Sequence, residues 1–213
     1  PRVLAIPQQQ VKKFEPANSV KKILINSMTA LQDYFKKTVI PELKTSLGLS
    51  STMQVPKITK VVVNAGIGRF IKDAHFIDGV EKTLSKITGQ KPVRTKAKIS
   101  ISNFKIREGQ EIGVMVTLRG KQMYHFLEKL LNVTFPRVRD FHGISDKSFD
   151  SQGNYTIGFK ENIAFPEVTV EEIDKMHGLQ IIVATTAKTR EHGKALLTAL
   201  GFPFQKPIPA KTK

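Results

Sequence analysis

The residues best suited to do chemistry lie in one cationic segment, 86–107, with the sequence KITGQKPVRTKAKISISNFKIR. This segment contains seven Lys or Arg residues and no Asp or Glu, and one aromatic ring, Phe104, lies among them. Unpaired charges are too costly to bury in a protein core, so the segment requires either solvent or a polyanion. Lys and Arg that neutralise phosphates, beside short polar side chains that fix the register, are typical of nucleic-acid binding. A solvated basic loop is the alternative interpretation.

The charge of the whole chain favours nucleic acid over a merely solvated loop. The 213 residues include 34 Lys or Arg and 18 Asp or Glu, which gives a net charge of +16. Such a field attracts nucleic acid or an anionic membrane. No apolar run approaches the roughly 18–20 residues needed to span a bilayer. No apolar region of a signal peptide is visible either. We therefore expect RNA as the partner and no membrane.

Enzymatic chemistry is not expected from the residue types present. The chain has no Cys, and its five His residues are scattered without the spacing of metal ligands. The segment 65–68, AGIG, resembles the start of a dinucleotide-binding fingerprint, but Ile71 occupies the third glycine position. We predict no catalytic residue, no metal, no cofactor and no small-molecule substrate.

Hydrophobic periodicity and turn residues predict the elements that position the cationic segment. The predicted strands cover Lys57–Asn64, a short stretch near Pro92–Thr95, Gln110–Arg119, Tyr155–Phe159 and Leu179–Ala187. The predicted helices begin at Ser27, Asp73, Gly120 and Arg190, and they end near Gly48, Gly89, Phe135 and Leu200. Pro41 is expected to kink or break the first helix. Beyond Thr95, the cationic segment is expected to be mobile.

This order of elements predicts an α+β fold. The helices are amphipathic and the strands are not apolar on both faces, which favours a mostly antiparallel sheet with helices on one face, of the split-βαβ or RRM-like kind. An open sheet face beside a basic loop is a platform for RNA. We expect an extended arm over 1–26, a single RNA-binding domain over 27–206 and a basic tail over 207–213, the arm and the tail being extended and basic.

Six blocks of the sequence, in order, resemble the large-subunit ribosomal protein number five family of bacterial type. They span about Ser27 to Lys206. The blocks are VPKITKVVVNAGIG, ITGQKPVRTKAKISISNFKIREG, IGVMVTLRG, FPRVRDFHGIS, KSFDSQGNYTIGFKE and GFPF. The resemblance implies a structural protein that binds 5S rRNA and other large-subunit rRNA in the central protuberance. It also implies contacts with the elbow of peptidyl-site tRNA and with a head protein of the small subunit, in a cytoplasmic or organellar ribosome.

Site residues follow from the resemblance and from side-chain chemistry together. Cations can neutralise phosphates, and amides or hydroxyls can bond to sugars, phosphates or unstacked bases. The predicted rRNA contacts are Asn64, Gln90, Lys91, Arg94, Thr95 and Lys96. The predicted tRNA-facing loop comprises Lys98, Ser100, Ser102, Asn103, Phe104, Lys105 and Arg107. The predicted intersubunit bridge comprises Arg137, Arg139, Asp140, Phe141 and His142.

Three alternatives stay open at this point. Phe104 can stack on a base, or it can anchor the loop by packing against the sheet. The long connection Arg137–Gly153 has no periodicity, so it is either a partner surface or a disordered excursion. The chain as a whole can also be a free-standing RNA-binding regulator or chaperone, because charge alone would suit that function.

Overall fold

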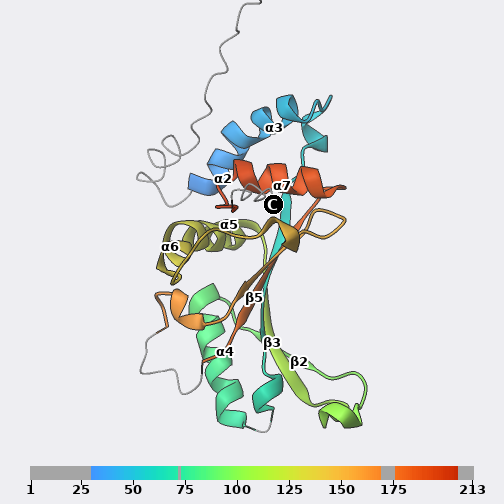
Figure 1. Ribbon diagram of the computed structural model, residues 1–213, viewed down its shortest axis with the longest axis vertical. Coiled ribbons are helices and arrows are strands. Elements are labelled where there is room, and N and C mark those ends of the chain that lie inside the picture. Colours follow the sequence, from blue (N-terminus) through green and yellow to red (C-terminus); the bar gives the residue numbers. More distant parts are fainter. Residues whose placement is uncertain (1–29, 72, 169–175, 206–213) are drawn as a thin grey trace, which may run out of the picture.

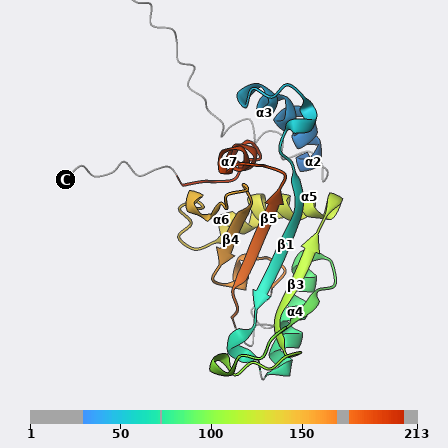
Figure 2. The same cartoon turned by 90° about the vertical axis from the view of Figure 1, so that its right-hand side faces the viewer.

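The predicted strands form one sheet in the computed structural model, which describes residues 30–71, 73–168 and 176–205. Their order is β2-β3-β1-β5-β4, and every neighbouring pair is antiparallel. Figure 1 shows this sheet nearly edge-on, and Figure 2 shows β3, β1, β5 and β4 side by side. The antiparallel α+β fold predicted from the sequence is therefore confirmed. The strands are β1 Ile58–Gly66, β2 Val93–Lys96, β3 Glu111–Leu118, β4 Tyr155–Phe159 and β5 Leu179–Thr185.

The two faces of this sheet differ because successive side chains of a strand point to opposite sides. Val61 and Val63 of β1 and Ile181 of β5 are completely buried on one face. The residues between them on the strands are only partly buried, as at Val62 and Ile182. Figure 2 shows the strands in front of α4 and α5, with the second face toward the viewer. We call this second side the open face.

Helix α4, Ala74–Thr88, covers part of the buried face and has the limits that its sequence predicts. The Asp73 carboxylate accepts a hydrogen bond from the Phe76 N–H at 3.2 Å, which satisfies one of the unpaired donors at the start of the helix. Gly89 ends the helix with φ of 68°, a conformation that costs glycine little. Its buried side chains are Phe76, Ile77, Val80, Leu84 and Ile87.

The other helices form a layer at and beyond one end of the sheet. Helix α5 lies on the same side of the sheet as α4, whereas α2, α3 and α7 lie beyond the end of the strands (Figure 1). Helix α2 contacts α5, and α3 contacts α7. The bounds are α2 Ala30–Tyr34, η1 Phe35–Val39, α3 Ile40–Ser46, α5 Gly120–Lys129, η5 Leu130–Thr134, α6 Phe135–Arg137 and α7 Arg190–Ala199. Short 3-10 turns occur at Thr52–Gln54, Gly68–Phe70, Ser102–Phe104, Asp146–Ser148 and Asn162–Ala164.

Two prolines lie inside helical runs, and each follows a π turn. Pro41 is in the first turn of α3 after η1, and Pro136 is in α6 after η5. The residue before each proline donates its N–H five residues back, from Ile40 to Phe35 and from Phe135 to Leu130. The wider π turn accommodates a ring that clashes with the carbonyl four residues earlier in a regular α-helix. The predicted break at Pro41 is therefore absent, and the helical run continues through α3.

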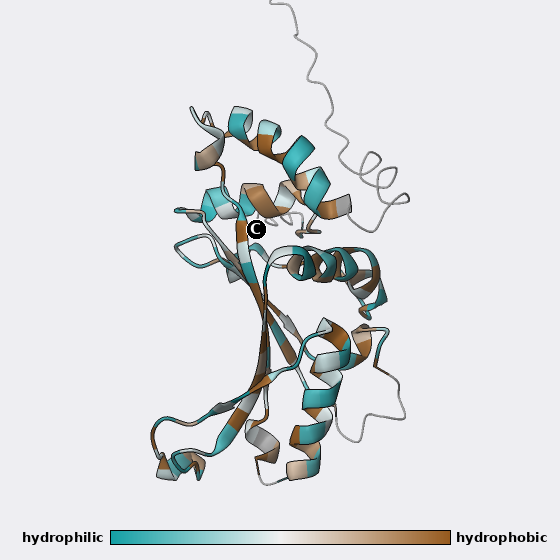
Figure 3. Cartoon of the chain, turned by 180° about the vertical axis from the view of Figure 1, so that it is seen from behind, coloured by the Kyte–Doolittle hydropathy of each residue, from teal (hydrophilic) through white to brown (hydrophobic). Residues whose placement is uncertain are grey.

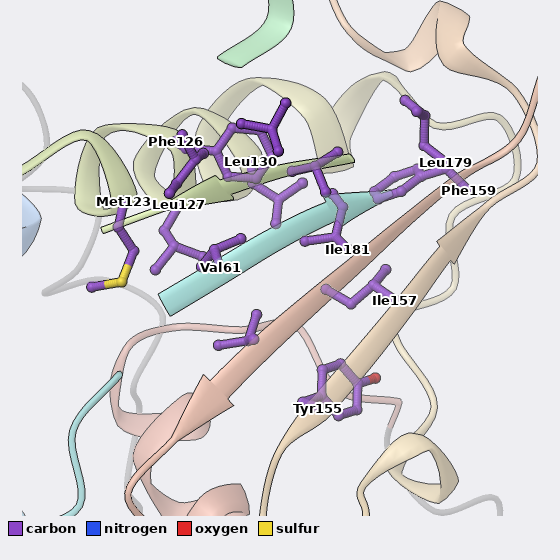
Figure 4. Close-up of a cluster of buried hydrophobic side chains, with 14 of the residues drawn as sticks. Val61, Met123, Phe126, Leu127, Leu130, Tyr155, Ile157, Phe159, Leu179 and Ile181 are labelled. Atoms are coloured by element: carbon purple, nitrogen blue, oxygen red, sulfur yellow. The ribbon is translucent and has the colours of Figure 1, made fainter. Parts of the chain in front are cut away.

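The buried apolar side chains form a single cluster between the sheet and the helices. Figure 4 shows its centre, where Met123, Leu127 and Leu130 face Val61 and Ile181. Burial of each such side chain contributes about 1.5–3 kcal/mol relative to leaving it exposed. The cluster is therefore the main source of stability for the sheet and for whatever it presents on its open face.

Several predicted features lie outside the described residues. These are the arm over 1–26, the start of the first helix at Ser27 and the tail over 207–213. None of the helices in the described ranges is long and apolar enough to cross a membrane.

Candidate nucleic-acid interface

Strands β2 and β3 continue past the sheet as a hydrogen-bonded hairpin, residues 97–110, which projects away from the core (Figure 1). Near its base, the Ala97 N–H donates to the Gln110 carbonyl at 2.8 Å. Farther out, Ile101 and Ile106 exchange backbone hydrogen bonds of 2.9 and 3.1 Å. A 3-10 turn and Lys105, with φ of 55°, close the tip. The sequence predicted a mobile segment here, and the structure shows backbone hydrogen bonds between its two arms at the base and near the tip.

The hairpin and the connection that leads to β2 carry most of the predicted phosphate-binding cations. All of these side chains are exposed, and none forms an ion pair with another residue of the described ranges. Exposed cations that the protein itself does not pair can neutralise phosphates. They are Lys91 of the connection, Lys96 at the end of β2, and Lys98, Lys105 and Arg107 of the hairpin.

Apolar side chains also reach solvent at the hairpin. Phe104 is 71% exposed and Ile99 is 72% exposed. Phe104 therefore does not anchor the loop by packing against the sheet, which removes one of its two interpretations. Figure 3 shows hydrophobic and hydrophilic residues together at the end of the hairpin. Base stacking by Phe104 stays a prediction.

The predicted polar contacts Asn64 and Thr95 lie together on the open face. A Cβ atom placed on Gly113 of β3 would lie 2.8 Å from Thr95 Oγ1 and 3.8 Å from Asn64 Oδ1. The side chains from β2 and β1 therefore converge over a glycine, where no side chain of β3 separates them. The sequence placed Asn64 and Thr95 in the same site through the family resemblance. It did not identify Gly113 as the residue that leaves space for them.

Other residues of the open face were missed by the sequence reasoning. Asn64 is paired in register with Met115 on one side and with Gln180 of β5 on the other. Gln180 is exposed and adds an amide next to that of Asn64. The signal that could have identified Gln180 is its position between Leu179 and Ile181, because alternate side chains of a strand point to opposite faces and these two apolar neighbours face the core. Gln90, by contrast, lies in the exposed connection between α4 and β2, outside the strands.

Arg94 lies on the opposite side of β2 and binds three carboxylates. Its guanidinium is 2.6 Å from Asp78, 2.6 Å from Glu81 and 3.2 Å from Glu111. Hydrogen bonds to Glu81, then Asp78 and Glu111, raise the pKa of Arg94 above its ordinary value. Arg94 therefore has an intramolecular role that the sequence did not reveal, in contrast to the five unpaired cations.

The predicted bridge residues lie at the end of α6, at Arg137, and in the loop that follows it. Arg137, Arg139, Asp140 and His142 are exposed, and Asp140 has φ of 51°. Phe141 is instead partly buried, with its ring stacked 5.2 Å from that of Phe135.

The rest of this long connection is attached to the domain and is not a disordered excursion. The Ile144 N–H donates to the Pro203 carbonyl at 2.8 Å, and the Tyr155 hydroxyl donates to the Ser145 carbonyl at 2.7 Å. Burial, with a smaller contribution from the charge of Asp146, raises the pKa of Tyr155 to about 12.

The histidines and acidic residues show no arrangement that would hold a metal ion within the described ranges. His177 is buried, with Nδ1 at 3.3 Å from the Asn162 side-chain nitrogen and its ring edge-on to Phe76. His142, the histidine of the predicted bridge, is exposed.

An antiparallel sheet with helices on one side, polar groups on its open face and an unpaired cationic hairpin defines an RNA-binding α+β protein. Two family models match the chain. One, described as Ribosomal protein L5, matches residues 51–107, and the other, which describes the C-terminus of the same ribosomal family, matches residues 111–204.

Two curated relatives, each named large ribosomal subunit protein uL5, agree with these models. The protein of Acholeplasma laidlawii is 51% identical over 177 residues, which cover 83% of this chain and 98% of the relative. That of Brevibacillus brevis is 51% identical over 178 residues, which cover 84% of this chain and 99% of the relative. The chain therefore belongs to the ribosomal protein L5 family, as the sequence blocks predicted.

Proposed function

We propose that this protein is a structural constituent of the large ribosomal subunit and that it binds 5S rRNA on its open face. The observation that carries the proposal is the convergence of Asn64 and Thr95 over Gly113 at the base of a cationic hairpin. Folded RNA is recognised through its shape and through hydrogen bonds to sugars, phosphates and unstacked bases. The open face offers such bonds, and Lys91 and Lys96 supply cations beside it.

The outer part of the hairpin is the proposed contact with peptidyl-site tRNA. This part projects from the core and combines unpaired cations with an exposed aromatic ring, Phe104. Cations bind the backbone, while an aromatic ring stacks on any base because every base has a π face. The proposed contact residues are Lys98, Ser100, Ser102, Asn103, Phe104, Lys105 and Arg107.

The loop after α6 is the proposed bridge to a head protein of the small subunit. Arg137 at the end of α6 and the loop residues Arg139, Asp140 and His142 are exposed, and they carry charge and hydrogen-bonding groups suited to a polar protein surface. Phe141 supports this loop through its stacking on Phe135 and does not itself face the partner. The loop and the hairpin lie apart in both views of the molecule, so two different partners can bind at once (Figures 1 and 2).

The test of 5S rRNA binding is a titration of the purified chain with 5S rRNA and with a control RNA of matched length. Each hydrogen bond contributes about 0.5–1.5 kcal/mol, so Asn64→Ala combined with Thr95→Ala should raise the Kd for 5S rRNA about fivefold or more. Thr198→Ala, on the exposed side of α7, should leave the Kd unchanged. Equal affinity of the unaltered chain for both RNAs would overturn the proposal.

Sedimentation separates a ribosomal constituent from a free-standing regulator. A constituent of the large subunit should sediment with that subunit in equal amounts and stay bound at moderate salt. Substoichiometric protein that dissociates at moderate salt would favour a regulator or chaperone instead. We propose the cytoplasmic ribosome as its location, on the basis of the bacterial relatives.

A further inference from the structure

We propose that Arg94 is a positioning residue for the RNA-binding surface and does not contact a phosphate. Through three carboxylates it fixes strand β2, and thereby both Thr95 and the cationic hairpin. This inference rests on the proposed function, because it explains how the surface assigned to RNA keeps its shape.

Strand β2 needs such a fixation because it has little else to hold it. It is a four-residue strand at the edge of the sheet and pairs only with β3. Its one large apolar side chain, Val93, is 62% exposed. Backbone pairing holds β2 to β3 on one side, and no side chain of β2 is fully buried. Polar contacts therefore supply much of what orients β2 relative to α4.

The register of β2 and β3 places Arg94 and Thr95 on opposite faces. Arg94 is paired with Val114, which is completely buried on the helix side, whereas Thr95 is paired with Gly113 beneath the polar group of the open face. A side chain that holds β2 from the helix side therefore sets the position of Thr95 on the other side. It also sets the direction in which the hairpin leaves the sheet, immediately after the register shift between Thr95 and Lys96.

The three carboxylates reach Arg94 from two elements. Asp78 and Glu81 lie one turn apart on α4, and Arg94 Nε donates to Glu81 Oε2 at 2.7 Å. Glu111 begins β3 and accepts from Arg94 at 3.2 Å. Contacts to both α4 and β3 prevent β2 from sliding or tilting relative to either. The planar guanidinium fork suits this arrangement, because its five donors point in fixed directions.

The same three carboxylates make Arg94 a poor ligand for phosphate. A phosphate that approached its guanidinium would also approach Asp78, Glu81 and Glu111, and like charges repel. The five unpaired cations of the hairpin region present no such obstacle. Charge and geometry therefore assign phosphate contacts to those five residues and a positioning role to Arg94.

Binding of 5S rRNA distinguishes the two roles, because they predict opposite effects of the same variant. Glu81→Ala combined with Glu111→Ala raises the net charge by two and leaves Arg94 with only one of its three carboxylates, Asp78. A phosphate-binding Arg94 would then bind RNA more tightly. A positioning Arg94 predicts weaker binding by roughly threefold to tenfold, matching Arg94→Met. The loss of one phosphate contact changes the slope of the logarithm of the binding constant against the logarithm of the salt concentration by about 0.7–0.9. Arg94→Met should change this slope by less than that amount.

Arg94→Lys is the conservative variant that separates charge from geometry. A lysine keeps the positive charge and can still neutralise a phosphate, but it cannot bond to three carboxylates in the planar directions of a guanidinium. The positioning role predicts that Arg94→Lys binds as weakly as Arg94→Met. Retention of the original affinity by Arg94→Lys, or tighter binding by the double carboxylate variant, would overturn the inference.

A second measurement needs no RNA and so separates this inference from the proposed function. The chain has no Cys, so thiol-reactive spin labels attach only to introduced cysteines. We place these at His75→Cys on α4 and Ser102→Cys at the hairpin tip. The distance distribution between the labels should be narrow in this background and should broaden with Arg94→Met. Lys98→Met, the matched control in the hairpin, should leave it narrow. An unchanged distribution in Arg94→Met would overturn the positioning role, whereas loss of 5S rRNA selectivity in the unaltered chain would overturn only the proposed function.

Discussion

The two edge strands of the sheet, β2 and β4, are held in contrasting ways. Tyr155, Ile157 and Phe159 of β4 are all buried, at 1%, 7% and 9% exposure, whereas no residue of β2 is buried. Around β4, the ring of Phe149 lies 4.5 Å from that of Tyr155, and the ring of Phe165 lies 5.7 Å from that of Phe159. Around β2, the corresponding contacts are the ion pairs of Arg94.

The difference shows how one sheet can combine a stable side with an accessible side, which carries the proposed RNA-binding surface. Burial of a large side chain contributes about 1.5–3 kcal/mol without demanding directional contacts, whereas an exposed ion pair contributes about 0.2–1 kcal/mol and fixes a direction. The β4 side therefore carries most of the stability. The β2 side gives up apolar burial, which leaves its backbone and cations accessible to RNA.

The largest expected effect is on the β4 side, at Phe165. This side chain is completely buried between Phe126 and Phe159, so Phe165→Ala removes buried surface and leaves a cavity. We expect a loss of about 3–5 kcal/mol in the free energy of unfolding, measured by urea denaturation. A loss below about 1 kcal/mol would contradict the assignment of stability to this side.

The same substitution on the β2 side, Phe104→Ala, is the matched comparison. Phe104 is 71% exposed, so the free energy of unfolding should change little. Binding of the RNA that contacts the hairpin should weaken by about 1–3 kcal/mol if Phe104 stacks on a base. Titration with tRNA and with 5S rRNA measures this loss, and Phe104→Trp should restore binding. Unaltered affinity for both RNAs would remove Phe104 from the interface.

Gly113→Ala tests whether the polar group on the open face needs the space above β3. The added Cβ would lie 2.8 Å from Thr95 Oγ1 and 3.2 Å from the Ala65 carbonyl oxygen. Overpacking of this kind costs about 1–3 kcal/mol, and we expect weaker 5S rRNA binding with it. Gly158→Ala on β4 is the control, because nothing lies within 4 Å of its added Cβ. Equal behaviour of the two variants in denaturation and RNA titration would refute the role of Gly113.

Charge reversal at Lys96→Glu and Lys98→Glu should weaken RNA binding without altering stability. Both side chains are exposed, so the free energy of unfolding should stay within about 0.5 kcal/mol of its original value. Each lost phosphate contact should flatten the log–log dependence of the binding constant on salt by about 0.7–0.9. Filter binding over a range of salt concentrations measures the slope. An unchanged slope would exclude these lysines from the interface.

The smallest expected effect concerns the ion pair of Asp146 with Lys194, which attaches the connection before β4 to α7. A hydrogen bond from Lys194 lowers the pKa of Asp146 below its ordinary value of 3.8. Since the folded-state pKa is the lower one, the stabilisation is complete well above pH 3.8 and is lost as the pH falls through the folded-state value. Asp146→Asn should therefore have a slightly lower Tm at neutral pH, with the difference shrinking below pH 3.8. A difference that does not depend on pH would exclude this ionisation as its cause.

Local features in the sequence were sufficient to predict most elements. Helix α4 is capped by Asp73 and Gly89 as predicted, because a capping carboxylate and a glycine with positive φ act within a few residues. Of the kink or break predicted at Pro41, the break is absent because a π turn, which needs no special residue, accommodates the ring. Asn64 and Thr95 were found through family blocks, yet their convergence over Gly113 depends on the register of three strands.

By itself, the sequence determined the family, the antiparallel α+β class and the position of the cationic segment, because each depends on local patterns or on charge. Only the tertiary structure distinguished Arg94 from the other cations of that segment. Its three carboxylates lie 13, 16 and 17 residues away, on a helix and on a neighbouring strand. Pairing at such separations depends on how α4 packs against the sheet and on the register of β2 with β3, and neither leaves a periodic signal in the sequence. The same holds for Phe141, whose stacking on Phe135 follows from the path of the loop after α6.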